Sequence, residues 1–410
     1  MRTAFTILFL LFGMVVFSNT IVVSKKGLHT SLRKAVALAQ DGDTILLHSG
    51  IYKEGNIVIT KSIRLIGMGN PVIDGEHRYE SLTISGTRIV VKGIHFRNSG
   101  YSAMNDHASI AVIDADHVII ENNTVENAYF AIKFSNANHC IVRDNIITGS
   151  PKSEQNSGNG IHLWKCDNML VSDNKVSGHR DGIYFEFVTH SIIQNNWSEK
   201  NIRYGLHFMF SNNDAYVNNT FKNNGAGVAV MYSNHVVMLG NLFEYNWGPN
   251  AYGILLKEIS DSKIFNNEFN QNTVGILMEG TNRIEAQQNQ FGGNGWALRI
   301  QASCDQNTVH HNNFQGNTFD VATNGSLMLN RFYNNYWDKY EGYDLDRDGF
   351  GDVAFHPVSL YSMVIEQNPN SVLLLRSFMV TLLDRAEKAL PSLTPEQFAD
   401  DRPLMKSLPL

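Results

Sequence analysis

One asparagine-centred phrase returns through the middle of this chain, and its spacing restricts the possible folds more than any other feature. The phrase appears in variants such as "VIIENNTVEN", "SIIQNNWSEK" and "SKIFNNEFNQN". By subtraction, its anchor asparagines recur at steps of 22, 29, 22, 23, 22, 26, 22, 24 and 22 residues, at Asn123, Asn145, Asn174, Asn196, Asn219, Asn241, Asn267, Asn289, Asn313 and Asn335. A period of this size indicates stacked units, each too small to bury a core of its own.

The composition of each unit indicates strands rather than helices. Short alternating runs of Ile, Val and Phe are separated by Asn and Gly, which is typical of strands joined by tight turns. We therefore predict an all-β fold, a right-handed parallel β-helix with three short sheets and coils of about 22 residues, over residues 19–338. The anchor asparagines are expected at turn positions with left-handed backbone, where their amides stack from coil to coil. A leucine-rich repeat has a similar period, but no LxxLxLxxN phrase recurs.

The two long steps and the two ends of the repeat predict additions to the coil. The 29-residue step contains "GSPKSEQNS" and the 26-residue step contains "NWGPNA". Both are expected to leave the coil as loops, which either bind a partner or are tolerated surface excursions. Upstream, "LHTSLRKAVALAQDGDTILLHSGIY" predicts a short helix and a first strand that cap the solenoid. After Trp337 the repeat stops, and we divide the remainder into an Asp-rich loop at 339–357 and a helical segment with a tail at 358–410.

The start of the chain and its charge limit the cellular context. Residues 1–18, "MRTAFTILFLLFGMVVFS", combine Arg2 with an apolar run and a small residue, which predicts a secretory signal peptide, the alternative being a buried strand or helix. A formal net charge of -6 with 18% charged residues argues against a nucleic-acid partner. The three cysteines, Cys140, Cys166 and Cys304, form no CxxC pair and are expected to be small core residues.

The stretch "YGLHFMFSNN" places unusual side chains on an outward strand face. Alternation puts Leu206, Phe208 and Phe210 on one face of the strand, and His207 and Met209 on the other, which is expected to be exposed. Aligning the strands on Gly160, Gly182, Gly205 and Gly227 produces two outward columns, which contain His162, Tyr184, His207, Ala229 and Trp164, Glu186, Met209, Met231.

These columns do not favour an enzyme. Glycan-cleaving β-helices need paired carboxylates, or a calcium site with a basic residue, on one open face. The columns contain one carboxylate, Glu186, so we predict no catalytic residues and no enzyme activity. A carbohydrate-binding or glycan-cleaving protein remains the alternative. The sequence also has no GxxxxGK[ST] motif, so the chain is not the nucleotide-hydrolysing part of a machine.

The segment "YDLDRDGFGD" contains a candidate calcium loop. Asp344, Asp346, Asp348 and Asp352 alternate with single residues, and Gly349 permits a turn, as in the oxygen-rich start of a calcium-binding loop. Phe355 stands where such a loop has its bidentate glutamate. The two interpretations are a calcium ion that staples the end of the coil and a solvated acidic turn.

An apolar segment near the C-terminus is a candidate docking element. It is too short and too charged to span a bilayer, but its apolar excess suits docking onto a membrane partner or the bilayer surface. The predicted docking residues are Leu373, Leu374, Leu375, Phe378, Met379, Leu382 and Leu383. The alternative is a helix that caps the solenoid's own end.

Several stretches of the sequence together resemble the NosD family. They are the "ALAQDGDTILLHSGIYKEGNIVITKSIRLIG" opening, the Asn coils with "DGIYFEFVTHS", "RYGLHFMFSNN" and "NAYGILLKEISDS", and the ending with "NNYWDKYEGYDLDRDGFGD" and "RPLMK". The resemblance implies a periplasmic, non-enzymatic accessory protein for the maturation of nitrous oxide reductase. It implies as partners an ABC-type ATPase and permease at the inner membrane, a copper-chaperone lipoprotein and the reductase. The apolar C-terminal segment would then dock on the permease.

The outward columns also contain donors that suit copper. Thioether and imidazole are soft-to-intermediate ligands that favour Cu(I) over calcium or magnesium. We therefore predict a transient Cu(I) site at His207, Met209 and Met231, with His162, Tyr184 and Glu186 as weaker candidates. The alternative is an apolar interface formed by the two methionines beside a surface histidine.

Overall fold

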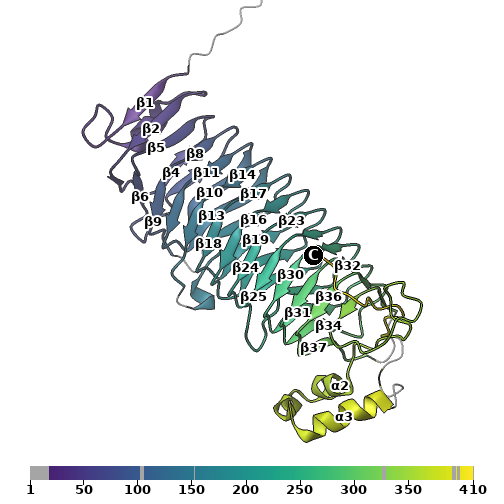
Figure 1. Cartoon of the computed structure of the whole chain (residues 1–410). Coiled ribbons are helices and arrows are strands. Elements are labelled where there is room, and N and C mark those ends of the chain that lie inside the picture. The colour runs from purple at the N-terminus through teal and green to yellow at the C-terminus, as the bar shows by residue number, and fades with distance from the viewer. Residues whose placement is uncertain are drawn as a thin grey trace, which may run out of the picture.

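The chain winds into a long parallel β-helix, as the asparagine repeat predicted (Figure 1). The computed structural model describes residues 18–101, 106–151, 153–325, 329–389, 394 and 398–409. Apart from Ser18, the predicted signal peptide lies outside these residues. Each full coil contributes one strand to each of three sheets, of 14, 13 and 12 strands, which we call sheets A, B and C.

All three sheets are parallel, and their strands have the following bounds. Sheet A contains β1 (Thr20–Val23), β2 (Thr44–His48), β5 (Arg64–Met68), β8 (Val90–Lys92), β11 (Ile119–Glu121), β14 (Ile141–Arg143), β17 (Leu170–Ser172), β20 (Ile192–Gln194), β23 (Ala215–Val217), β26 (Val237–Leu239), β29 (Lys263–Phe265), β32 (Glu285–Gln287), β35 (Thr308–His310) and β38 (Arg331–Tyr333). Sheet B contains β3 (Ile51–Tyr52), β6 (Val72–Asp74), β9 (His95–Arg97), β12 (Thr124–Glu126), β15 (Ile146–Thr148), β18 (Lys175–Ser177), β21 (Trp197–Glu199), β24 (Thr220–Lys222), β27 (Leu242–Glu244), β30 (Glu268–Asn270), β33 (Gln290–Gly292), β36 (Asn313–Gln315) and β39 (Tyr336–Trp337). Sheet C contains β4 (Ile57–Ile59), β7 (Leu82–Ile84), β10 (Ala108–Asp116), β13 (Phe130–Asn138), β16 (Ile161–Trp164), β19 (Asp181–Glu186), β22 (Tyr204–Met209), β25 (Ala226–Met231), β28 (Ile254–Lys257), β31 (Val274–Glu279), β34 (Trp296–Ile300) and β37 (Phe319–Thr323).

The core is a stack of inward side chains that runs along the axis of the β-helix. Most strands of sheets A and B have three residues, of which the central one is buried. In sheet B these central residues include the fully buried rings of Phe221, Phe243, Phe269, Phe291 and Phe314, whose neighbouring centroids lie 4.7 to 5.4 Å apart. Because each ring packs on the coil before and after it, no single coil can bury its own core.

The anchor asparagines form a continuous hydrogen-bonded ladder, but they are not the left-handed residues of the turns. Asn174 Nδ2 donates to Asn196 Oδ1 at 3.0 Å, and Asn196 Nδ2 donates to Asn219 Oδ1 at 2.9 Å. The left-handed backbone belongs to the preceding residue of each turn, as at Asn195 (φ 55°) and Asn218 (φ 53°). The predicted conformation was therefore wrong by one residue, while the predicted stacking is confirmed.

One anchor was also assigned to the wrong residue. Asn289 Nδ2 donates to Asn312 Oδ1 at 3.0 Å, so Asn312 and not Asn313 is the member of the ladder in that coil. Spacing could not separate the two adjacent asparagines. The buried Phe314 supplies the missing signal, since in neighbouring coils the core phenylalanine stands two residues after the anchor.

A second asparagine ladder, which the repeat analysis missed, follows the strands of sheet B. Each of its members accepts a backbone N–H from the preceding coil, and the ladder consists of Asn201, Asn224, Asn246, Asn272, Asn294 and Asn317.

The three cysteines are buried and free, as expected for small core residues. Burial raises the pKa of Cys140 to about 11 and that of Cys166 to about 12.

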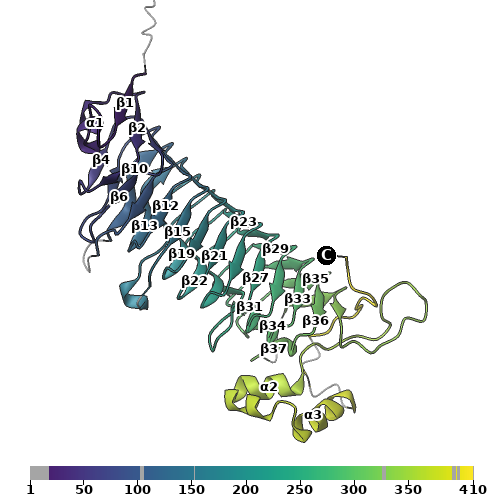
Figure 2. The ribbon, with the colours of Figure 1, turned by 60° about the vertical axis from the view of Figure 1, so that its left-hand side comes forward.

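Both ends of the solenoid are covered. At the N-terminal end α1 (Leu32–Leu38) lies beside β1, β2 and β4 (Figure 2), and Glu54 accepts the N–H groups of Leu32 and Arg33 in its first turn. At the C-terminal end the buried Asp400 terminates the anchor ladder, because its carboxylate accepts from Asn335 Nδ2 at 3.1 Å and from Trp337 Nε1 at 3.0 Å.

A pair of helices lies beyond the last strands of sheet C (Figures 1 and 2). They are α2 (Leu360–Gln367) and α3 (Phe378–Ala389), joined through the 3-10 helix η2 (Pro369–Leu374). Tyr361 and Ile365 of α2 are buried against Phe319 of β37, and Leu383 of α3 packs on the same cluster. The ion pair between Arg299 of β34 and Glu366, at 2.8 Å, holds α2 on sheet C. Among the described residues, none of the helices has the length and apolar character needed to cross a membrane.

Candidate functional site

The outer face of sheet C arranges the candidate residues in the two columns that the glycine alignment predicted. Tyr184 of β19 pairs in register with His207 of β22, and His162 of β16 pairs with Tyr184. In the second column Glu186 pairs with Met209, and Met209 pairs with Met231 of β25. The two thioethers therefore stand on adjacent strands, one step along the solenoid from each other.

His207 faces outward from the sheet but is not exposed. Its relative exposure is 5%, because the rings of Tyr184 and Tyr204 lie against it with centroids 5.0 and 4.9 Å away. The expectation of an exposed histidine was therefore wrong, since alternation gives the direction of a side chain and not what covers it. Phe210, expected on the inner face, is 38% exposed, because β22 ends before it and its backbone is left-handed (φ 51°). Nε2 of His207 is buried and has no hydrogen-bond partner. A buried ring nitrogen without a partner is costly unless it meets a ligand.

The other ring nitrogen of His207 meets a buried charge pair that the sequence analysis missed. Arg203 donates to both carboxylate oxygens of Asp181, at 2.9 and 2.6 Å, and its Nη2 lies 3.3 Å from His207 Nδ1. Burial by itself would raise the pKa of Asp181, but the nearby His207, at 3.8 Å, and the hydrogen bonds from Arg203 outweigh it and hold that pKa below its usual value. The Asp-Gly pair at the start of β19 was the available signal, and its arginine partner stands one coil later.

Tyr184 connects His207 with the methionine column. Its hydroxyl donates to Glu186 Oε2 at 3.2 Å and lies 4.0 Å from Met209 Sδ. Burial, followed by the charge of Glu186, raises the pKa of Tyr184 to about 12, so the phenol stays neutral. Met209 and Met231 are half-buried, and Met231 packs on an apolar cluster of the same sheet face. The arrangement therefore leads from a partly open pair of thioethers to a buried imidazole.

His162 is less suited to binding copper, because other side chains already contact its ring. Its ring stacks on Tyr184 with centroids 4.8 Å apart, and its Nδ1 lies 3.0 Å from Asn159 Nδ2. Burial, with the charge of Lys133, lowers the pKa of His162 to about 3, so the ring is neutral and its Nδ1 is already occupied. It remains a weaker candidate for copper.

The two predicted insertions border this face, and a side chain in the first and one directly after the second reach the start of β22. The first contains the 3-10 helix η1 (Glu154–Asn156), and Glu154 Oε1 lies 3.9 Å from Arg203. The second ends directly before Tyr252, whose hydroxyl donates to that of Tyr204 at 3.4 Å. The insertions therefore flank the strand that carries His207 and Met209.

The acidic loop brings three of its four predicted ligands together. Carboxylate oxygens of Asp344, Asp346 and Asp348 lie within 4.8 Å of one another. Asp352 instead accepts the N–H of Leu345 at 2.7 Å, and Arg402 donates to Asp348 at 2.6 Å. The arginine already supplies a positive charge to this loop, and calcium binding stays a prediction.

Most of the predicted docking residues are exposed on the C-terminal helices. Six of them have relative exposures between 40% and 86%, namely Leu373, Leu374, Leu375, Phe378, Met379 and Leu382. The seventh, Leu383, packs inward on the cluster around Phe319. The helix pair therefore covers the solenoid end with one face and presents an apolar face outward.

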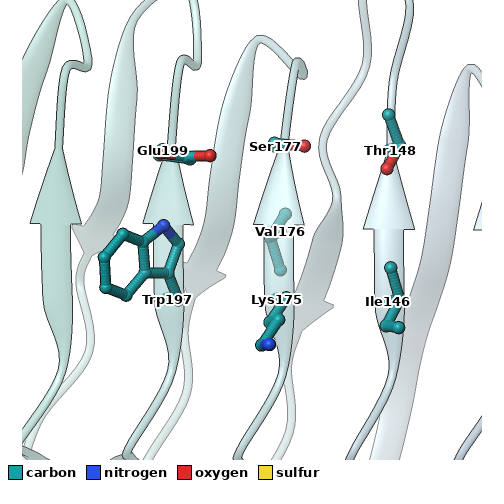
Figure 3. Close-up of a pocket in the computed structure, with 7 residues that line it drawn as sticks. All are labelled: Ile146, Thr148, Lys175, Val176, Ser177, Trp197 and Glu199. Atoms are coloured by element: carbon teal, nitrogen blue, oxygen red, sulfur yellow. The ribbon is translucent and has the colours of Figure 1, made fainter.

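A separate hollow of about 350 Å³ lies on the outer face of sheet B, away from these columns. Figure 3 shows Ile146, Lys175 and Trp197 side by side on neighbouring strands, with Thr148, Ser177 and Glu199 in the next row. Its lining residues include one carboxylate, Glu199, so this hollow does not supply a carboxylate pair for glycan cleavage.

Comparison with known proteins identifies relatives along nearly the whole chain. Residues 145–343 match the sequence model of the family described as "Periplasmic copper-binding protein (NosD)". A "Probable ABC transporter binding protein NosD" of Pseudomonas aeruginosa is 31% identical over 387 residues, which cover 90% of each chain. A protein with the same description from Stutzerimonas stutzeri is 29% identical over 123 residues, which cover 29% of this chain and 28% of that one.

Solved structures with a similar shape are distant in sequence. The hyperthermoactive exopolygalacturonase of Thermotoga maritima has a TM-score of 0.49 at 11% identity, with 72% of this chain and 83% of that chain covered. The A-module of mannuronan C-5 epimerase AlgE4 from Azotobacter vinelandii has a TM-score of 0.43 at 15% identity, with 70% and 86% covered.

Proposed function

Because this chain belongs to the NosD family, we propose that it is a periplasmic accessory protein that binds and relays copper during maturation of nitrous oxide reductase. In this role it works with an ABC-type ATPase and permease and receives copper from a chaperone lipoprotein. The descriptions of the family and of its Pseudomonas aeruginosa relative support the copper and the ABC-transporter parts of this proposal.

The observation that carries the copper proposal is the unpartnered Nε2 of His207 on a sheet face that also carries two neighbouring thioethers. Met209 and Met231 are register partners, and Met209 stands two residues from His207 on the same face of β22. Residues two apart on a strand are separated by roughly 6.6 Å and adjacent strands by roughly 4.8 Å, so the three side chains can reach one ion. One imidazole and two thioethers favour Cu(I).

The donor set also suits release of the ion. All three cysteines are buried elsewhere in the core, and burial raises the pKa of Cys140 and Cys166, so neither supplies a thiolate near this face. Thioethers are weaker ligands than thiolates because they carry no charge. A site of this kind holds Cu(I) moderately and passes it on, as a relay requires.

A competition titration against a Cu(I) chelator tests this site. The variant combines His207→Ala, Met209→Ala and Met231→Ala, and the matched control combines His235→Ala, Met68→Ala and Met379→Ala, which removes the same residue types elsewhere. We expect the first variant to lose at least about tenfold in Cu(I) affinity, since even indirect changes at metal sites cost about 10- to 100-fold. The control should bind as the native chain does. Equal copper retention by all three proteins, each with a native circular dichroism spectrum, would remove this site.

The alternative is a protein that binds or cleaves glycans. It predicts turnover of polyuronates by the purified chain and loss of that turnover in Glu186→Gln. We expect no turnover, because Glu186 already accepts the Tyr184 hydroxyl and the nearby Asp181 is paired with Arg203. Turnover that depends on Glu186 would replace the relay proposal with an enzyme.

A further inference from the structure

Two histidines and an aspartate meet on the turn that follows the sheet C strands, far from the candidate copper site. Asp116 ends β10, and His117 and His139 occupy the same turn position in consecutive coils. The two imidazole rings stack with centroids 5.0 Å apart. Their Nδ1 atoms lie 2.7 and 2.9 Å from different oxygens of the Asp116 carboxylate. These three side chains form what we call the ridge cluster.

The backbone sets this arrangement. His117 and His139 have φ values of 55° and 51°, so both adopt the left-handed conformation of the turn. Asp116 and Asn138 are register partners in parallel strands, which places the residues that follow them directly above one another. The stacking of consecutive coils, rather than a flexible loop, therefore places the two imidazole rings against each other.

We propose that the ridge cluster of Asp116, His117 and His139 is a binding site for a divalent transition-metal ion of intermediate softness, such as Zn²⁺ or Cu²⁺. Two imidazoles and one carboxylate are typical ligands of such ions. The cluster lacks thioethers, so its preference differs from that of the site at His207. Four strand spacings of roughly 4.8 Å separate β10 from β22, which places the two sites about 19 Å apart along the axis.

The distances within the ridge cluster suit a metal ion after a small adjustment. One ligand atom from each residue lies within 4.8 Å of the other two. Ligands around a tetrahedral Zn²⁺ stand about 3.3 Å apart at bond lengths of about 2.0 to 2.1 Å. The side chains of both histidines are more than half exposed, at 59% and 52%, so they can move by the remaining distance and an ion can reach them from solvent.

The charge of the cluster favours a cation. The Asp116 carboxylate places one oxygen against each imidazole. Its charge faces both ring nitrogens, and a metal ion that replaces the Nδ1 protons would keep all three contacts. A site with a carboxylate and two histidines then leaves one position of a tetrahedral ion open to water or a partner.

The chain contains a matched comparison for this cluster. Two coils further along, Asp167 accepts from His190 Nδ1 at 2.8 Å in the same turn, and His190 has the same left-handed φ of 51°. In place of a second imidazole, Asp167 has Thr189 and Asn168 as its partners. This second group of residues therefore repeats the pairing of one aspartate with one histidine, but it offers one imidazole ligand fewer than the ridge cluster.

Titration of the purified chain with Zn²⁺ alone, and electron paramagnetic resonance after addition of Cu²⁺, tests the proposal. The chain is prepared without a histidine tag. The site variants are His117→Asn and His139→Asn, and the matched control is His190→Asn. Asparagine is chosen because it tolerates the left-handed turn and already occupies this position as Asn168.

We expect each site variant to weaken Zn²⁺ binding by at least about tenfold, since even loss of an outer partner costs about 10- to 100-fold. His190→Asn should bind as the native chain does. Native Cu²⁺ spectra should show two nitrogen ligands, and His139→Asn should show one fewer. The proposal is overturned if the double variant His117→Asn, His139→Asn binds Zn²⁺ as tightly as the native chain, or if His190→Asn loses as much. The His207, Met209, Met231 variant should leave Zn²⁺ binding unchanged, so this test is independent of the relay proposal.

Discussion

At the scale of single residues, the positioning of His207 depends on the buried pair formed by Asp181 and Arg203. Asp181 is fully buried and Arg203 is 30% exposed, so removal of the carboxylate leaves a largely desolvated guanidinium beside the imidazole. We expect Asp181→Asn to lower the free energy of unfolding by about 3 to 5 kcal/mol, the usual cost of breaking a buried pair. Urea denaturation of the native chain and of the variant measures this difference in the free energy of unfolding.

The control for this change is Asp261→Asn. Asp261 accepts two bonds from Arg283, with the same step between neighbouring coils, but both side chains are substantially exposed. An exposed pair contributes less because water screens it. A loss in Asp181→Asn no larger than that in Asp261→Asn would contradict the assignment of a buried, structurally important pair.

Another buried carboxyl group makes stability depend on pH. Asp214 Oδ1 accepts the N–H of Ser191 at 2.8 Å, but Oδ2 is buried without a partner. Burial, with the charge of Asp167, raises the pKa of Asp214 to about 8 despite the bond from Ser191. A raised pKa means that the folded chain retains this proton after the unfolded chain has lost it. The contribution of Asp214 is therefore fully present below pH 4 and is lost between about pH 4 and pH 8.

We expect Asp214→Asn to remove this loss. An asparagine accepts the corresponding N–H elsewhere in the solenoid, as Asn307 does from Ile284. The variant should gain stability relative to the native chain, and the gain should grow as pH rises from 4 to 8. Thermal unfolding at several pH values gives the comparison. A difference that does not change with pH would show that the Asp214 carboxyl titrates normally.

Only some features of the site around His207 could be predicted from the sequence. Strand alternation and the glycine alignment predicted the columns in which His207, Met209 and Met231 lie, because both depend on local geometry. They could not show that Tyr184 and Tyr204 cover His207 or that Arg203 pairs with Asp181. The contact of Tyr184 with His207 and the pair of Arg203 with Asp181 join residues 22 or more positions apart in neighbouring coils, while Tyr204 lies three residues before His207 on the same strand.

At the scale of elements, the anchor ladder joins successive coils through buried amides. Asn219 Nδ2 donates to Ile193 O and Asn241 Oδ1, and its Oδ1 accepts from Asn196. Asn219→Ala leaves several of these buried groups without partners, at about 1 to 3 kcal/mol for each unsatisfied group. We expect a loss of at least about 2 kcal/mol in the free energy of unfolding, measured by denaturant titration.

The control is Asn195→Gly. Asn195 is an exposed turn residue with left-handed backbone, and it stands directly before the ladder member Asn196. Glycine adopts this conformation without strain, so the substitution should cost little. Equal losses in both variants would mean that the turn conformation and not the ladder carries the stability. The repeat period predicted the ladder, and the phenylalanine two residues after the anchor in neighbouring coils distinguishes Asn312 from Asn313, while the left-handed position required the backbone itself.

At the scale of the whole molecule, the C-terminal region both closes the solenoid and presents an apolar surface. Deleting everything after Val358 would remove Asp400 and uncap the anchor ladder together with the helices. The sharper change is Leu373→Gln, Phe378→Gln, Leu382→Gln, which alters the exposed face and leaves the cap in place. We expect this variant to lose co-purification with the membrane permease while it keeps the native unfolding temperature.

The control replaces exposed apolar residues on the solenoid, Ile146→Gln and Ile192→Gln, which are 52% and 44% exposed. It should still co-purify with the permease. If the helix variant binds the permease as well as this control does, the helices serve as a cap alone. The sequence predicted both roles for this segment as alternatives, and the structure shows the inward face of α2 and α3 packed on β37.

The central claim is that His207, Met209 and Met231 hold Cu(I) as it passes through this protein. X-ray absorption of the chain loaded with one equivalent of Cu(I), in a His117→Asn, His139→Asn background that disables the ridge cluster, tests it most directly. The account predicts sulfur and nitrogen around copper in a ratio of two to one, with the sulfur signal lost in Met209→Ala, Met231→Ala. Copper surrounded by nitrogen and oxygen alone, or a spectrum that the methionine changes leave unaltered, would contradict it.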